Sequence, residues 1–208
     1  MKFLLVAATE GELSALREQI GRESMESSVD FLVTGIGMVA TTHALTRHLL
    51  HRSYDVILNI GIAGALDHSL ALGTVVVVNS DSIYGLGIED GERILSLQEA
   101  GLPGDESVVP VRLFENSFTS TLPKVKGLTV NTASGHESSI SLIKSRSTAS
   151  VETMEGAAFY FVCNQEGVSG VQLRAISNRV ERRNRSAWDL ELAVRNLQEA
   201  VMLFIKSC

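Results

Sequence analysis

Met154-Glu155-Gly156-Ala157-Ala158 opens an apolar helical segment, and Arg174-Ala175-Ile176-Ser177-Asn178 ends a β-rich run that follows it. Open α/β sheets hold their ligands at the turns where strands end and helices begin. The two runs therefore bring a carboxylate, a thioether and a carboxamide to one edge of a predicted sheet. Glu155, Met154 and Asn178 are the first candidate site residues.

The rest of the chain repeats this alternation of strands and helices. Apolar runs rich in valine and isoleucine that do not alternate with polar residues are typical of strands buried on both faces. They occur at residues 3–8, 31–33, 56–60, 74–78, 128–130 and 171–176. Helical patterns occupy 10–20, 38–51, 154–165 and 187–206. The pattern predicts an α/β protein, a three-layer α/β/α sandwich with a central mixed, largely parallel sheet.

Length and composition suit one domain over residues 1–208. The chain has 208 residues, 45% of them hydrophobic, and no Pro-rich linker, which is enough for a sheet covered on both faces. Residues 84–110 lose the pattern and contain glycines, acidic residues and two of the three prolines. We expect a long surface excursion there.

Composition also restricts the partners. The net charge of −6 disfavours nonspecific binding to nucleic acid. The two cysteines have no metal-ligand spacing and form no disulfide framework, so we expect a reducing, cytoplasmic setting and no metal site. The apolar amino terminus stops at Thr9-Glu10, short of the roughly 18 residues of a membrane span. A small-molecule partner is expected.

Five stretches, in order along nearly the whole chain, together resemble the nucleoside phosphorylase and nucleosidase superfamily, whose members break the bond between a purine and a ribose. They are the two opening runs and the segments 8–12 (Ala-Thr-Glu-Gly-Glu), 35–40 (Gly-Ile-Gly-Met-Val-Ala) and 59–64 (Asn-Ile-Gly-Ile-Ala-Gly). The resemblance implies a nucleoside phosphorylase-like fold, no cofactor and a homo-oligomer, a dimer or larger.

Cleavage of a purine N-glycosidic bond develops positive charge on the sugar. Glu155 is the candidate ribose clamp, since one carboxylate accepts hydrogen bonds from two adjacent hydroxyl groups. The alternative is that it only complements a helix dipole. The resemblance implies that Met154 presses against the sugar ring. The alternative is ordinary packing in the core. Gly64 follows a strand in a turn that permits close ligand approach.

Glu12 is the candidate for polarising the attacking water, because its position matches the superfamily's N-terminal glutamate. Thr9-x-x-Glu12 is also a capping-box pattern, in which the glutamate closes a hydrogen bond to the threonine backbone. Both roles predict the same location. Glu10 is the nearby substitute.

Asn178 stands where the best-known adenine-releasing nucleosidases of the superfamily have Asp. A carboxamide donates to a 6-oxo group and accepts from a protonated ring nitrogen, and mispairing a buried polar edge costs about 1–3 kcal/mol. Asn178 therefore favours hypoxanthine or guanine over adenine. The alternative is a turn or helix-capping asparagine.

Residues 178–189 begin with an asparagine that follows Ser177, and they contain four arginines and a Trp-Asp pair. They resemble the futalosine hydrolase branch, which releases hypoxanthine from futalosine on a route to menaquinone. That nucleoside carries a carboxylated aromatic ring. Arg182 or Arg185 would pair with the carboxylate and Trp188 would pack on an aromatic or purine face. The alternative is a solvated basic loop.

Other functions stay open at this point. A methylthioadenosine or S-adenosylhomocysteine nucleosidase releases adenine, which Asn178 does not favour. A phosphorylase would need a site for the phosphate anion, and the acidic turn at residues 9–12 is a poor one. A nucleoside-binding protein without activity is a third. Residues 35–40 also fit the dinucleotide fingerprint G-x-G-x-x-A of an NAD-binding oxidoreductase, but the following strand ends in Asn59-Ile60-Gly61 without the expected acidic residue.

Overall fold

The computed structural model describes residues 1–23, 28–91 and 93–208. The strands are β1 (Phe3–Ala7), β2 (Val29–Val33), β3 (Val56–Ala65), β4 (Val75–Ile83), β5 (Ile88–Asp90), β6 (Arg93–Leu95), β7 (Ser107–Val108), β8 (Lys124–Thr129), β9 (Val151–Thr153) and β10 (Ser169–Arg179). The α-helices are α1 (Glu10–Arg22), α2 (Met38–Leu49), α3 (Glu137–Arg146), α4 (Gly156–Glu166) and α5 (Leu190–Lys206).

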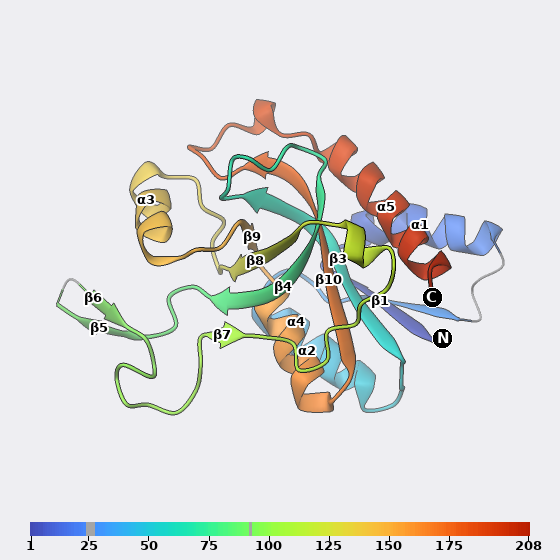
Figure 1. Ribbon diagram of the computed structural model, residues 1–208, viewed down its shortest axis with the longest axis horizontal. Helices are drawn as coiled ribbons and strands as arrows, with labels where there is room; N and C mark the ends of the chain where they lie inside the picture. Colours follow the sequence, from blue (N-terminus) through green and yellow to red (C-terminus); the bar gives the residue numbers. More distant parts are fainter. Residues whose placement is uncertain (24–27, 92) are drawn as a thin grey trace.

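One mixed sheet organises these elements (Figure 1), in the order β10-β4-β8-β9-β3-β1-β2, with β7 beside β4. Strand β3 also pairs in parallel with β10, so β3, β10, β4, β8 and β9 close into a ring. The predicted α/β class and mixed sheet are confirmed. The sandwich description does not fit this ring. Strand β3 pairs with β1 at its start and with β9 at its end, so the sheet curves and closes there.

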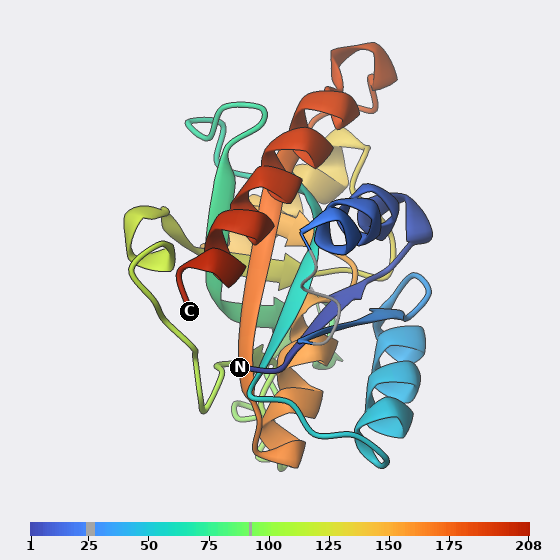
Figure 2. The ribbon, with the colours of Figure 1, turned by 90° about the vertical axis from the view of Figure 1, so that its right-hand side faces the viewer.

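Two helical layers cover the open part of the sheet, as a sandwich predicts (Figure 2). On β1, Phe3, Leu5 and Ala7 belong to the core that contains α1 and α5. The intervening Leu4 and Val6 belong to the core that contains α2 and α4. Because successive side chains of a strand point to opposite faces, a continuous apolar strand is what two covered faces require.

The six predicted strands and four predicted helices are all present, with shifted ends. Helix α4 begins at Gly156 and α5 at Leu190, each two or three residues later than expected. Helix α3 and strand β9 were not predicted, because neither has a clear apolar period. No helix within the described ranges has the length and apolar character needed to cross a membrane.

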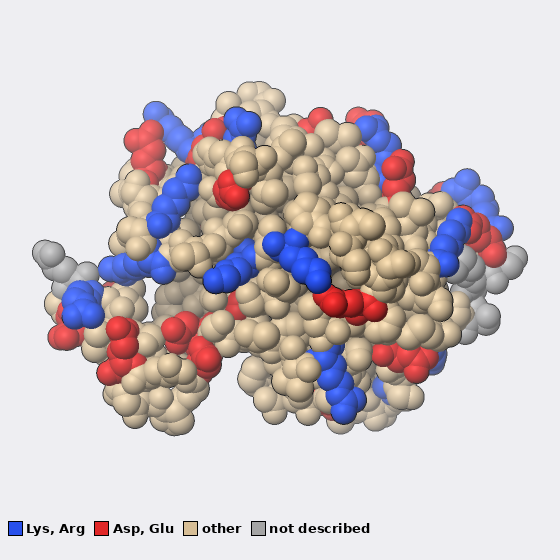
Figure 3. All heavy atoms as spheres, in the orientation of Figure 1, with Lys and Arg blue, Asp and Glu red and all other residues tan. Residues whose placement is uncertain are grey.

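The predicted excursion at residues 84–110 is confirmed. It contains the antiparallel pair β5–β6, which projects away from the main sheet (Figure 1), and it returns through β7 to pair with β4. On the face shown in Figure 3, acidic and basic side chains are interspersed over the surface.

A chain of buried polar side chains crosses the interior of the ring. Asp81 accepts hydrogen bonds from Thr129 Oγ1 at 2.8 Å and from Gln172 Nε2 at 3.2 Å. Arg174 Nε donates to Gln172 Oε1 at 2.9 Å, and its Nη2 donates to Asn59. Burial raises the pKa of the Asp81 carboxyl group to about 6, against the hydrogen bonds from Thr129 and Gln172 that lower it.

The raised pKa of Asp81 predicts a pH-dependent stability. Between pH 4 and 6 the folded protein holds a proton on Asp81 that the unfolded chain has released, so this group's contribution to stability falls as pH rises. Asp81→Asn removes the titration. In urea unfolding, the stability of the wild-type protein minus that of the variant should fall between pH 4 and 6 by up to about 3 kcal/mol, then level off. A difference that does not change with pH would contradict this.

Candidate functional site

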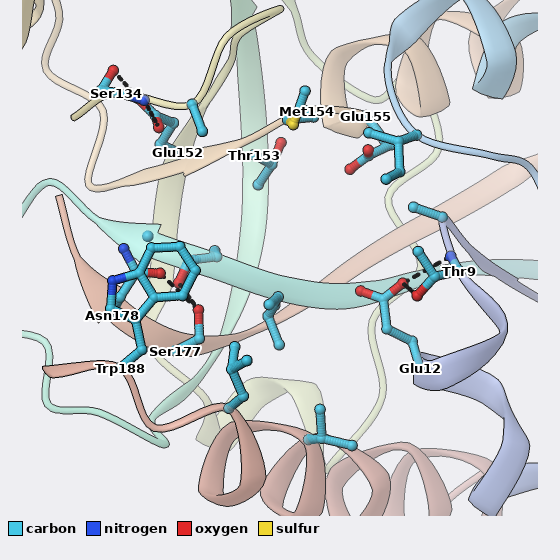
Figure 4. A pocket seen from close by; sticks show the side chains of 18 of the residues that line it. Thr9, Glu12, Ser134, Glu152, Thr153, Met154, Glu155, Ser177, Asn178 and Trp188 are labelled. Carbon is cyan, nitrogen blue, oxygen red and sulfur yellow. Dashed lines mark hydrogen bonds between the residues drawn. The ribbon is translucent and has the colours of Figure 1, made fainter. Parts of the chain in front are cut away.

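A cavity of about 490 Å³ lies where β3, β9 and β10 end and where α1 and α4 begin (Figure 4). This volume is within the range of small-molecule sites. Figure 4 shows two groups of polar side chains at opposite ends of the cavity. One end holds Glu12 and Glu155, and the other holds Asn178, Glu152 and Ser134.

Glu155 lies directly before α4 and is only 7% exposed. Its Oε1 accepts a hydrogen bond from the backbone N–H of Gly37 at 3.0 Å. Gly37 has a φ of +92° and immediately precedes α2, which explains why glycine stands there. Glu155 therefore joins the starts of two helices and still borders the cavity, where its remaining lone pairs can accept further hydrogen bonds.

The same contact argues against a dinucleotide site at residues 35–40. In that motif the amides at the helix start bind a pyrophosphate. Here the Gly37 amide binds the Glu155 carboxylate. A phosphate placed beside this carboxylate would be repelled.

Glu12 has both of the features expected of it. Its Oε2 accepts hydrogen bonds from the backbone N–H and the hydroxyl of Thr9, each at 3.0 Å, as in a capping box. Glu12 also lines the cavity. Glu10 is exposed and pairs with Arg17 at 3.0 Å. Of these two glutamates, Glu12 is the one at the cavity.

Arg174 is a residue that the sequence interpretation did not assign to the site. A Cβ atom added to Gly61 would overlap Arg174 Nη1 and would lie 2.8 Å from Glu12 Oε1. The guanidinium and the carboxylate thus both border the space that a side chain at position 61 would fill. An arginine within a continuous apolar strand was the available signal, because such a charge is buried only when it has partners.

Asn178 is the second-last residue of β10 and borders the opposite end of the cavity. Its Oδ1 accepts from Ser177 Oγ at 2.8 Å, and its Nδ2 donates to the Arg179 carbonyl at 3.0 Å. One N–H and one oxygen lone pair of the amide remain for a ligand. Asn178 pairs in register with Gly64 on β3, and a Cβ at Gly64 would lie 3.3 Å from the Asn178 amide nitrogen.

Met154 and Trp188 complete the predicted lining. Met154 packs in part against the apolar cluster around Leu128 and also borders the cavity. Trp188 lies beside Asn178 in Figure 4, and the Arg183 guanidinium lies 5.8 Å from the centroid of its ring.

The structure does not bring all the predicted arginines to the cavity. Arg182 and Arg185 are exposed and lie outside its lining, whereas Arg179 and Arg183 line it. The Arg183 backbone N–H donates to the Gly135 carbonyl at 3.2 Å, and this bond holds the arginine segment against the loop that contains Ser134.

A family model described as the phosphorylase superfamily matches residues 2–206. The chain belongs to the phosphorylase superfamily. Within it, the chain is similar to the futalosine hydrolase of Acidothermus cellulolyticus, with 30% identity over 181 residues that cover 84% of this chain and 74% of that protein. It is similar to the futalosine hydrolase of Thermus thermophilus, with 31% identity over 188 residues, 82% of this chain and 78% of that protein.

Solved structures of the superfamily share the fold. The futalosine hydrolase of Helicobacter pylori superposes with a TM-score of 0.82 at 17% identity, covering 100% of this chain and 98% of that chain. The 5'-methylthioadenosine/S-adenosylhomocysteine nucleosidase of Helicobacter pylori, bound to butyl-thio-DADMe-Immucillin-A, superposes with a TM-score of 0.83 at 17% identity, covering 100% and 99%. At this identity the likeness concerns the fold alone.

Gly61→Ala tests whether the Arg174 guanidinium and the Glu12 carboxylate fill the space beside position 61. Arg174 is held by Gln172 and Asn59 and is 2% exposed, so it cannot move away from an added methyl group. We expect a loss of about 1–3 kcal/mol of unfolding free energy, measured by urea denaturation.

Gly11→Ala in α1 is the matched control. Its new Cβ would have its nearest neighbour at 3.9 Å, and alanine favours the helix by up to about 1 kcal/mol. Equal stability of the two variants would contradict the proposed crowding at Gly61.

Proposed function

We propose that the protein is a futalosine hydrolase, which uses water to release hypoxanthine from futalosine. The observation that carries the proposal is the arrangement of the cavity, with the Asn178 amide at one end and the Glu155 and Glu12 carboxylates at the other. The two curated relatives that bear this name support it. No cofactor is required by the reaction.

In this reaction the bond between the sugar C1' and the base N9 breaks, and its electron pair leaves with the base. The sugar becomes cationic at C1'. Glu155 accepts hydrogen bonds from the ribose hydroxyls, and its charge stabilises this cation. Water then bonds to C1' and releases a proton, while the departing purine takes up one. One water is consumed for each hypoxanthine released.

Glu12 and Arg174 orient the water. The carboxylate accepts a hydrogen bond from it, and the Arg174 guanidinium borders the same space beside Gly61. Thr9 holds Glu12 through two hydrogen bonds, so the carboxylate is already aligned before substrate enters. Such prior alignment is a main source of catalytic power.

Asn178 binds the leaving base through the amide groups that its local hydrogen bonds leave free. The N–H donates to the 6-oxo oxygen, and the oxygen accepts from a protonated ring nitrogen. An amide is a poor general acid, so the base takes its proton from solvent. Gly64 leaves room for this amide itself. Trp188 stacks on an aromatic face, and Met154 contacts the sugar.

The carboxylated aromatic ring of the substrate requires a basic partner. That Arg182 or Arg185 provides it stays a prediction, which would require their segment to close over the substrate. Arg183 already lines the cavity and packs on Trp188.

We also propose a homo-oligomer, in which a second copy covers the surface beside the cavity mouth. Ile36 lines the cavity and is 62% exposed, and Val39 on α2 is 85% exposed. Phe161 on the neighbouring α4 is 47% exposed. Adjacent exposed apolar side chains of this kind mark association surfaces.

The direct test of the function is chromatography of free base after incubation with futalosine, inosine or methylthioadenosine, with and without phosphate. We expect hypoxanthine from futalosine at a rate independent of phosphate. Glu155→Gln should lower kcat at least 100-fold, because it removes the charge that faces the cation. Glu166→Gln, an exposed change at the last residue of α4, should leave kcat unchanged. Phosphate-dependent release or an unaffected Glu155→Gln variant would reject the proposal.

Asn178→Asp tests whether this residue determines the preference for a 6-oxopurine over adenine, because methylthioadenosine nucleosidases share the fold. A protonated carboxyl group donates to the imidazole-ring nitrogen of adenine and accepts from its 6-amino group. The ratio of kcat/KM for methylthioadenosine to that for futalosine should rise at least 10-fold, which is about the effect of one mispaired hydrogen bond on the free energy of binding. An unchanged ratio would show that Asn178 does not contact the 6-position.

A further inference from the structure

Arg174 is a buried cation whose charge is not compensated by a direct ion pair. Its side chain lies within the ring and is 2% exposed, and the Asp81 carboxylate is fully buried nearby. None of the ion pairs found among the described residues includes either group. A buried charge is costly unless an opposite charge or a set of hydrogen bonds compensates it. The contacts that compensate Arg174 also determine where its guanidinium points.

Gln172 links these two charges. Its Oε1 accepts from Arg174 Nε at 2.9 Å, and its Nε2 donates to Asp81 Oδ2 at 3.2 Å. A carboxylate only accepts hydrogen bonds, and a guanidinium only donates them. The amide between them therefore has one orientation in which both contacts form, with its oxygen toward Arg174 and its NH₂ group toward Asp81. The relay Asp81–Gln172–Arg174 thus joins a buried anion to a buried cation.

Asp81 is fixed in turn by the segments around it. Thr129 Oγ1 donates to Asp81 Oδ1 at 2.8 Å and accepts from the Ala157 N–H of α4 at 2.8 Å. A Cβ atom added to Gly127 or to Gly156 would lie 2.5 or 2.1 Å from Asp81 Oδ2, respectively. The carboxylate thus lies close against two backbone segments, and dense packing of this kind leaves it little freedom to move.

The direction of the Arg174 guanidinium follows from its contacts. Gln172 accepts from Nε, and Asn59 accepts from Nη2. Because the guanidinium is planar, two fixed nitrogens determine the direction of the third. This third nitrogen, Nη1, borders the space beside Gly61, and Glu12 Oε1 borders the same space.

We propose that Asp81 is a positioning residue, which acts through Gln172 to orient the Arg174 guanidinium toward the space beside Glu12. Asp81 itself lies outside the cavity lining. This inference rests on the proposed function, in which Glu12 and Arg174 orient the attacking water. Loss of the acceptor at position 81 lowers the rate of the chemical step and leaves substrate binding intact.

Asp81→Asn tests the relay because it replaces one acceptor oxygen by a donor. With its NH₂ group toward Gln172, the new amide faces a second donor. Rotation of the Gln172 amide only moves the contact between two donors to Arg174 Nε. With its NH₂ group toward Thr129, the new amide leaves that hydroxyl hydrogen a contact of 3.4 Å to Thr153. Each arrangement leaves at least one buried donor without a close acceptor.

The double variant Asp81→Asn/Gln172→Glu restores the polarity of the relay. The amide now at position 81 donates to the carboxylate now at position 172, which still accepts from Arg174 Nε. Thr129 keeps an acceptor oxygen at position 81, and the net charge of the protein is that of the wild type. A loss of general stability at position 81 would not be repaired in this specific way by the change at position 172.

Nuclear magnetic resonance measures the position of Arg174 without turnover. The exchange of its Nε–H with solvent reports whether this donor stays hydrogen-bonded. Asp81→Asn should speed this exchange about 10-fold or more, and the double variant should return it to within about threefold of the wild-type rate.

Kinetics with futalosine measure the consequence for the reaction. They are recorded at about pH 8, where the Asp81 carboxyl group, whose pKa is about 6, is ionised. Asp81→Asn should lower kcat about 10- to 100-fold, the effect of misplacing a group that aligns a reactant. KM should stay within about threefold of the wild-type value, because Arg174 acts on the water rather than on the nucleoside.

The double variant should recover kcat to within about threefold of the wild-type value, because the two changes act on one contact and are not additive. Asp90→Asn, an exposed change on β5, is the matched control for the lost charge. It should keep the wild-type kcat, KM and Arg174 exchange rate.

Unchanged exchange or unchanged kcat in Asp81→Asn would overturn the proposal, as would a double variant that recovers neither. If Asp81→Asn does not fold, the double variant is compared with the wild type alone. Folding with nearly wild-type kcat then supports the relay, and failure to fold overturns it. A wild-type protein that releases no hypoxanthine from futalosine would contradict the proposed function instead, and the exchange rates would still show whether Asp81 orients Arg174.

Discussion

The pairing of β3 with three different strands is the constraint on which the site depends. Its first residues pair with β1, its last residues with β9, and its whole length with β10. Each neighbour contributes one part of the cavity: β1 leads into the turn that holds Glu12, β9 carries Glu152 and leads to Glu155, and β10 carries Asn178. A slip of one residue in any of these pairings would turn a functional side chain to the opposite face.

The two glycines of β3 make room for this convergence. Gly61 leaves room for the Glu12 carboxylate and the Arg174 guanidinium, and Gly64 leaves room for the side chains of Val180 and Asn178. The polar chain from Asp81 through Gln172 then holds Arg174 from inside the ring. Buried polar groups are costly unless every member is satisfied, so this network fixes one geometry. The stability of the ring and the position of the proposed catalytic groups therefore have the same cause.

Local patterns predicted most of the fold and part of the site. Continuous apolar runs identified the strands, and Glu12 appeared both as a capping residue and at the cavity, as one short motif implied. The closure of the ring was not predictable from such runs, because an apolar strand does not reveal which strands it pairs with. Glu152 was missed for the same reason, since its place at the cavity depends on the pairing of β9 with β3. The arginine spacing after β10 likewise did not show that Arg183, rather than Arg182 or Arg185, lines the cavity.

The central claim is that the two ends of the cavity hold the two halves of one nucleoside, the base at Asn178 and the ribose at Glu155. The most direct measurement is a crystal structure of the catalytically impaired Glu155→Gln variant with futalosine bound. The account predicts the purine with its 6-oxo edge at Asn178 and the ribose hydroxyls at position 155. A purine bound at the Glu12 end, or a nucleoside outside this cavity, would contradict it.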